Sequence, residues 1–181
     1  MIALGLLHNY GFIREKNRSP HDPISIEKQR RDIDHDIKIF NKLNASIPEI
    51  DFKGYVEGVL SSHSYISKPE DLRDFFFYEG DKCDNDFVNE DLNRSKNALH
   101  DALLKFEDFK SKHFFVHGPN RANGNLYLCM RPEWNIDRGG NPSSEEEGRY
   151  CELSSQLSSL GRELLKAYDE YRTAVKKVLS I

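Results

Sequence analysis

The sequence lacks a long apolar run and any regular spacing of cysteines. Its apolar stretch at residues 2–7 is far shorter than the about 20 residues that a helix needs to span a bilayer. The three cysteines, Cys83, Cys129 and Cys151, are an odd number at wide separations, which fits neither a disulfide framework nor a CxxC zinc pair. We therefore expect a reducing, cytoplasmic environment and no bound metal.

An excess of basic charge is also missing. The chain has 26 Lys and Arg against 30 Asp and Glu, for a net charge of −4, whereas proteins that bind nucleic acids usually present a basic face. The patterns GxxxxGK[ST], GxGxxG and GxSxG do not occur in the sequence. We therefore expect no nucleic-acid partner and no cofactor. The sequence also lacks the motifs that usually indicate nucleotide hydrolysis or α/β-hydrolase chemistry.

The 181 residues that are present suit one domain with its own hydrophobic core. Charged residues make up 31% and hydrophobic residues 38%, a balance typical of long helices with one buried stripe and a wide solvated face. We expect a single helical domain over residues 21–181, preceded by an apolar and basic segment at residues 1–20. This segment is either a helix that docks on the core or on a second copy, or a membrane-proximal tail that contacts a membrane through residues 1–13.

Apolar side chains recur at steps of three and four residues along most of the chain, which predicts helices. The predicted helices cover residues 23–44, 52–66, 72–78 and 90–113, and a last helix begins after a cap at Ser143 or Ser144. The last helix has the clearest pattern, an unbroken seven-residue repeat from Tyr150 to Val178. Gly161 within it would let a neighbouring helix approach closely.

Residues 113–130 do not follow the helical spacing and instead show the alternating pattern of strands. Two apolar runs flank a turn region with Gly118-Pro119 and Asn123-Gly124, which predicts a β-hairpin. The stretch at residues 131–148 is irregular. Together these patterns predict a mainly α protein, an antiparallel bundle of four to six long amphipathic helices with a short β-hairpin insertion near residues 113–130.

Arg followed by His after a short interval is a spacing found in helical ribonucleases of the HEPN class. Three pairs fit it: Arg14 with His21, Arg30 with His35, and Arg94 with His100. Roughly one such pair is expected by chance, so we infer no family membership. Arg94 and His100 are the catalytic candidates, but six residues along one helix separate their side chains onto different faces, whereas acid–base catalysis needs them to converge.

The loop that follows the predicted hairpin is the most suggestive region for ligand binding. It contains Arg131, Trp134, Asp137 and Arg138, and Arg121 lies in the hairpin turn. Arginine forks and free backbone N–H groups suit carboxylate or phosphate, which makes these residues the candidate ligand-binding set. The competing interpretation is structural: Trp134 closes one end of the helices and the charged residues pair with their neighbours.

These observations favour a non-catalytic helical interaction or sensing module that self-associates as a homo-oligomer or binds a protein partner. The sequence has extended apolar stripes along its predicted helices, and it shows no set of reactive side chains that would converge on one site. The alternatives are a ribonuclease that uses one Arg/His pair and a membrane-associated module held by its N-terminal segment.

Overall fold

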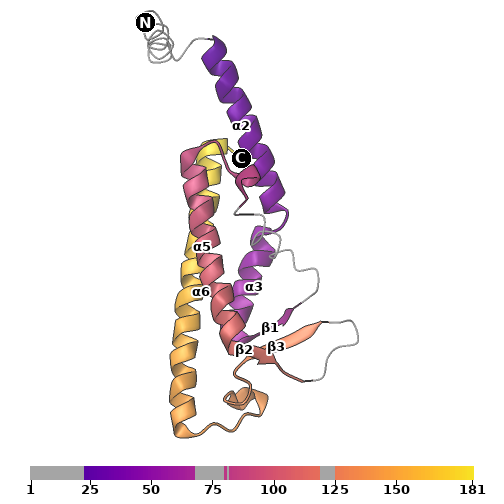
Figure 1. Cartoon of the computed structure of the whole chain (residues 1–181), viewed down its shortest axis with the longest axis vertical. Helices are drawn as coiled ribbons and strands as arrows, with labels where there is room; N and C mark the ends of the chain where they lie inside the picture. The colour runs from indigo at the N-terminus through magenta and orange to yellow at the C-terminus, as the bar shows by residue number, and fades with distance from the viewer. Residues whose placement is uncertain (1–22, 68–79, 81, 119–124) are drawn as a thin grey trace, which may run out of the picture.

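The computed structural model describes residues 23–67, 80, 82–118 and 125–181, and it is mainly helical with a small antiparallel sheet (Figure 1). The helices are α2 (Pro23–Asn44), α3 (Glu49–Ser62), α5 (Glu90–His113) and α6 (Ser144–Leu179). The strands are β1 (Ser64–Ser67), β2 (Phe114–Val116) and β3 (Leu126–Met130), and 3-10 turns lie at Cys83–Asn85 and Ile136–Arg138. The helices predicted over residues 23–44 and 90–113 are confirmed. The one predicted over 72–78 lies outside the described residues.

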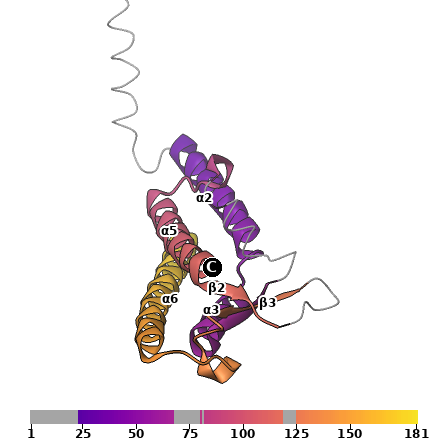
Figure 2. The same cartoon turned by 60° about the horizontal axis from the view of Figure 1, so that its bottom comes forward.

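The two longest helices, α5 and α6, lie side by side and run in opposite directions (Figures 1 and 2). Their facing side chains step by three and four residues and are fully shielded from solvent, as the periodicity of the sequence predicts. The α5 residues of this seam are Leu92, Leu99, Leu103 and Phe106, and the α6 residues are Leu157, Leu164, Tyr168 and Tyr171.

The helices α2 and α3 contact α6 at different heights. Phe52 of α3 stacks on Tyr168 at 4.7 Å between ring centroids, and Phe40 of α2 lies 6.4 Å from the ring of Tyr171. Gly161 of α6 faces Leu60 of α3, and a Cβ at Gly161 would come within 2.5 Å of the Leu60 Cδ2 atom. Only the second half of α2 takes part, because none of residues 23–35 is buried.

The helix α3 is shorter than its spacing predicts, so the prediction that it runs through Ile66 is wrong. It ends at Ser62, and His63 takes the left-handed conformation, φ 49°, with its N–H donating to the Val59 carbonyl. The chain then turns directly into β1, where Tyr65 and Ile66 have the side chains that strands favour.

The hairpin predicted near residues 113–130 is confirmed in β2 and β3, and β1 adds a third strand that the sequence pattern did not predict. The strand order is β1-β3-β2, and both pairs are antiparallel. Cross-strand partners share a face, so Tyr65 with Leu128 and Phe114 with Met130 point toward the helices. The opposite face carries Ser64, Cys129 and Phe115.

The start of α6 settles which serine is its cap. Ser143 accepts a hydrogen bond from the Glu146 backbone N–H, and the Glu146 carboxylate accepts one from the Ser143 backbone in return, which completes a capping box. Among the described residues, no helix is long and apolar enough to cross a membrane. The predicted N-terminal segment, residues 1–20, lies outside them.

Two buried tyrosines of α6 differ in how their hydroxyl groups are satisfied. The Tyr168 hydroxyl donates to the Ile47 carbonyl at 3.1 Å, whereas the Tyr171 hydroxyl is buried without a hydrogen-bond partner among the described residues. An unmet buried polar group costs about 1–3 kcal/mol. We therefore expect Tyr171→Phe to leave the free energy of unfolding unchanged or raise it, and Tyr168→Phe to lower it by roughly 1–2 kcal/mol. Urea denaturation checks both, and an equal loss in the two variants would contradict the assignment.

Candidate functional site

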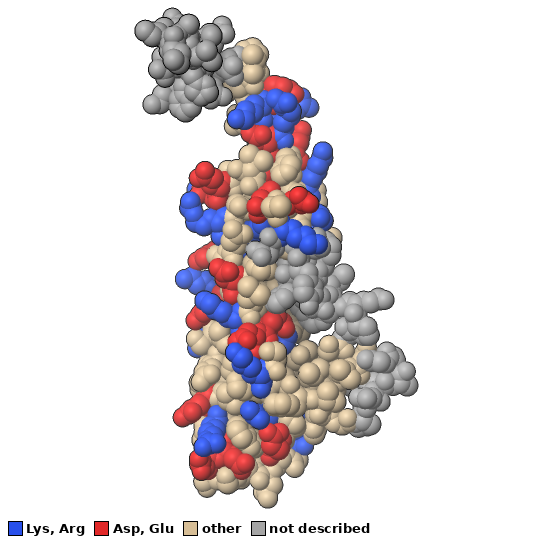
Figure 3. Space-filling view, in the orientation of Figure 1, with Lys and Arg blue, Asp and Glu red and all other residues tan. Residues whose placement is uncertain are grey.

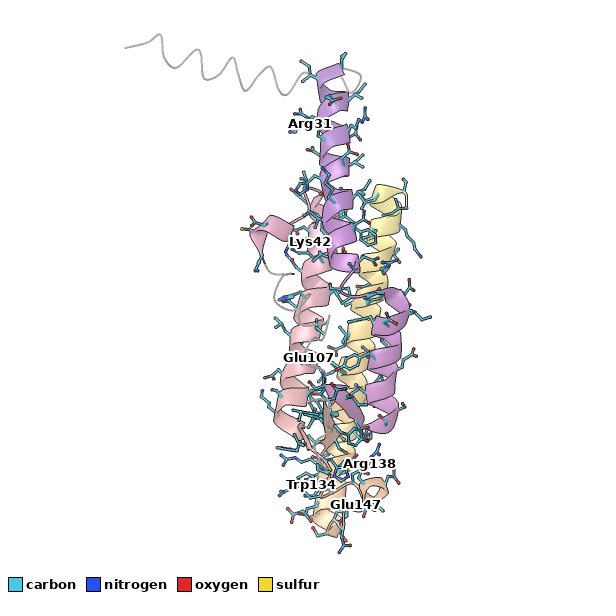
Figure 4. All side chains as sticks on the ribbon, turned by 90° about the vertical axis from the view of Figure 1, so that its right-hand side faces the viewer. Arg31, Lys42, Glu107, Trp134, Arg138 and Glu147 are labelled. Atoms are coloured by element: carbon cyan, nitrogen blue, oxygen red, sulfur yellow. The ribbon has the colours of Figure 1, made fainter. Side chains whose placement is uncertain are left out.

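The loop after β3 folds back over the sheet face that points away from the helices. The Met130 N–H donates to the His63 carbonyl at 2.9 Å and the Arg131 N–H donates to the His113 carbonyl at 3.0 Å. The loop therefore leaves the sheet at the point where α3 and α5 end. Figure 4 shows Trp134 and Arg138 at this end of the molecule, near Glu147 in the first turn of α6.

Arg131 joins the loop to the sheet through aromatic contacts. Its guanidinium carbon lies 4.9 Å from the ring centroid of Phe115 in β2 and 4.9 Å from that of Trp134 in the loop. Such cation–π contacts stabilise by about 0.5–2 kcal/mol, depending on desolvation. The indole N–H of Trp134 in turn donates to Glu146 at 3.0 Å, so that the loop is attached to both the sheet and α6.

Arg138 makes the second attachment to the sheet. Its guanidinium carbon lies 5.4 Å from the ring of Tyr127 in β3, and its Nη2 donates to the Ser64 hydroxyl at 3.1 Å. The Tyr127 hydroxyl also donates to Ser64, at 3.0 Å. Asp137, by contrast, is exposed. The structure thus brings together three of the predicted loop residues, Arg131, Trp134 and Arg138, while Arg121 lies outside the described residues.

A chain of hydrogen bonds runs beneath this loop. The Asn135 side-chain amide donates to the Tyr150 hydroxyl at 2.8 Å, that hydroxyl lies 2.8 Å from His63 Nδ1, and His63 Nε2 lies 3.2 Å from the Ser154 hydroxyl. Burial raises the pKa of Tyr150 to about 12, so the phenol keeps its proton. It accepts from Asn135, and the histidine tautomer sets the direction of its hydrogen bond with His63 Nδ1.

The direction of this chain decides what His63 can do. In the tautomer whose Nδ1 accepts from Tyr150, neutral His63 carries its proton on Nε2 and donates it to Ser154. A general base would instead need to accept the serine proton at Nε2. In either tautomer, the contact between Ser154 and His63 joins the end of α3 to α6.

The buried charges outside the loop are also matched. Lys96 pairs with Asp86 at 2.6 Å, and Lys110 pairs with Glu107 at 2.6 Å while its ammonium lies 4.3 Å from the ring of Tyr65. The buried carboxylate of Asp36 accepts the backbone N–H groups of residues 88 and 89 at 2.7 and 3.0 Å. These charges hold elements together, as buried ions must be paired to be tolerated.

The Arg/His candidates of α5 do not converge. Arg94 has a 76% exposed side chain that pairs with Asp91 at 3.2 Å, whereas His100 is buried on the core side of the helix. Within residues 23–67, 80, 82–118 and 125–181, no group of three or more His, Cys, Asp or Glu side chains is arranged to hold a metal ion. The charged side chains on the face shown in Figure 3 are intermixed in sign.

The chain matches no known family model, and no curated protein or solved structure matches it either. Inference about function therefore starts from the geometry of the described residues.

Two guanidinium groups remain the chemically distinctive feature of the loop. The Nε atoms of Arg131 and Arg138 are buried without a hydrogen-bond partner among the described residues. Guanidinium groups suit carboxylate or phosphate oxygens, and here only their outer nitrogens could meet an anion, because both Nε atoms are shielded from solvent. Arg131 Nη1 already lies 3.5 Å from the Glu133 carboxylate. Sequence reasoning found these arginines from composition, but it missed His63, Asn135 and Ser154 as one network, because His63 lies 91 residues before Ser154.

The hydrogen-bonded state of His63 predicts a pH dependence of stability. Burial lowers the pKa of His63 below its ordinary 6.5, so the folded protein resists protonation while the unfolded chain accepts it. Stability is thus full above about pH 6.5 and falls as the pH drops below that value. We expect His63→Asn, which tolerates the left-handed conformation, to lose less stability than the wild type between about pH 7.5 and 5.5.

Urea denaturation at both pH values measures this difference. Burial also lowers the pKa of His113, but that residue is present in both proteins, so its contribution cancels in the comparison. An identical loss of stability in wild type and variant would show that His63 is not held neutral.

Proposed function

We propose that the protein is a non-catalytic interaction module that associates with a second copy of itself through its long helices, which form an antiparallel bundle. The observation that carries this proposal is a pair of exposed isoleucines on one face of α2. Ile26 and Ile33 are 52% and 37% exposed, on a half-helix that extends beyond the ends of α5 and α6 (Figure 1).

Physical chemistry supports a partner for this half-helix. A helical segment of about a dozen residues that packs against nothing is only marginally stable in water and frays from its free end, because tertiary packing supplies most of the stability of helices in proteins. Branched apolar side chains aligned on one exposed face add surface that association removes from water. A contacting partner therefore stabilises both the helix and the exposed isoleucines.

The arrangement of charged groups supports a role without catalysis. Arg94 is exposed whereas His100 is buried, Lys96 and Lys110 form ion pairs, and the Asp36 carboxylate accepts backbone N–H groups. His63 is hydrogen-bonded to both Tyr150 and Ser154. These groups account for the strongest reactive candidates in the described part of the chain.

Sedimentation velocity over a wide concentration range tests self-association. We expect the 21.0 kDa chain to shift reversibly toward twice that mass as its concentration rises. Reductant belongs in the buffer because Cys83 and Cys151 are exposed and would otherwise form covalent links between copies. A single species of monomer mass at every concentration would overturn the proposal.

A sensing role is the second candidate, favoured by the two guanidinium groups, of Arg131 and Arg138, that the loop places over the sheet. We expect inorganic phosphate or citrate to raise the melting temperature of the wild type above that in chloride at equal ionic strength, because a ligand of the folded state stabilises it. Arg138→Gln should remove most of this shift. Arg149→Gln, which changes an exposed arginine paired with Glu145, should keep it. Equal shifts in all three proteins would reduce the effect to general salt stabilisation.

A further inference from the structure

The helix α2 has two apolar faces. Its buried face consists of Asp36, Ile39, Phe40 and Leu43 and packs toward α6. Ile26, Ile33 and Ile37, which we call the isoleucine row, follow one another at steps of seven and four residues and therefore lie along one line of the helix. At 100° per residue this line is rotated by about 90° from the centre of the buried face.

Exposure increases along the isoleucine row toward the start of the helix. Ile37 is partly buried at the edge of the core, Ile33 is 37% exposed and Ile26 is 52% exposed. The row is thus continuous with the core at one end and open to solvent at the other. Arg31, labelled in Figure 4, marks the part of α2 that stands beyond the ends of α5 and α6.

We infer that the isoleucine row is covered by the same row of a second copy, with the two α2 helices antiparallel. This inference rests on the proposed self-association and names its surface. The charges beside the row decide the direction. Arg30 and Asp34 are exposed, lie on the side of the row away from the buried face, and form no ion pair with a described residue.

An antiparallel pair centred near Asp32 matches both charge and shape. It places Ile26 of one copy opposite Ile37 of the other, and Arg30 opposite Asp34 of the second copy, twice by symmetry. In a parallel pair the two-fold axis would put the flank with Arg30 and Asp34 of one copy on the opposite side of the interface from the same flank of the other copy, so these charges would not meet. Ile33 lies near the two-fold axis in the antiparallel pair.

The neighbourhood of Ile33 extends the apolar surface beyond the helix. Ile33 lines a hollow together with Val88 and Val178, and Val88 is exposed. Even with this hollow, two short helix segments form a contact at the small end of specific interfaces. We therefore expect a weak, reversible dimer that forms in the micromolar range, about the affinity of transient complexes.

A charge-reversal cycle tests the pairing. Arg30→Asp and Asp34→Arg each place like charges across the interface, and we expect each to raise the dimer dissociation constant about tenfold or more. The double variant Arg30→Asp/Asp34→Arg restores opposite charges, and we expect its dissociation constant to return to within about threefold of wild type. Sedimentation velocity measures all four proteins, and far-UV circular dichroism checks that their helix content is equal.

Substitutions in the row give an independent test. Ile26→Asp with Ile33→Asp should abolish dimerisation. The matched control Ile50→Asp changes an isoleucine of α3 that is 83% exposed and outside the row, and it should dimerise like wild type.

The outcomes separate the two proposals. A wild-type dimer that all row and charge variants preserve would overturn the α2 surface and leave self-association intact. A double variant as weak as the single ones would overturn the antiparallel pairing. A wild type that stays monomeric would overturn self-association itself.

Discussion

The packing around two tyrosines of α6 is the constraint on which the other helices depend. Tyr168 stacks on Phe52 of α3, and Tyr171 lies against Phe40 of α2 and, at 6.3 Å between ring centroids, against Phe87 before α5. One helix therefore positions three segments that are far apart in the sequence. Burial raises the pKa of both tyrosines, so each phenol stays neutral.

Sequence periodicity predicted the long helices well because their burial repeats over many turns. Leu99 and Leu103 of α5 are buried on one face of their helix, and so are Leu157 and Leu164 of α6. Because the same spacing repeats over many turns, one residue that departs from it does not change the prediction. The end of α3 was not predictable in this way. The spacing of Phe52, Val56 and Val59 continues through Ile66, and only the pairing of β1 with β3, about 60 residues further along the chain, ends the helix at Ser62.

The loop over the sheet was partly predictable for a related reason. Arg131, Trp134 and Arg138 are close in sequence, and the structure places them in one loop, where Phe115 and Tyr127 of the hairpin receive the guanidinium groups. The His63 network joins residues that no local pattern links, since the packing of α3 on α6 brings His63 to Tyr150 and Ser154. The same helical geometry that predicted α5 also separates Arg94 from His100.

The length of α6 gives the molecule a mechanical property. Its 36 residues form one helix of about 54 Å at 1.5 Å per residue. Trp134 is attached to its first turn through Glu146, and near its other end the ring of Phe40 in α2 lies 5.2 Å from the guanidinium carbon of Arg172. Because an α-helix resists bending over this distance, a tilt of about 5° at the loop moves the far end by roughly 5 Å. The helix therefore connects the sheet loop to α2 as one continuous rod that packs against α5.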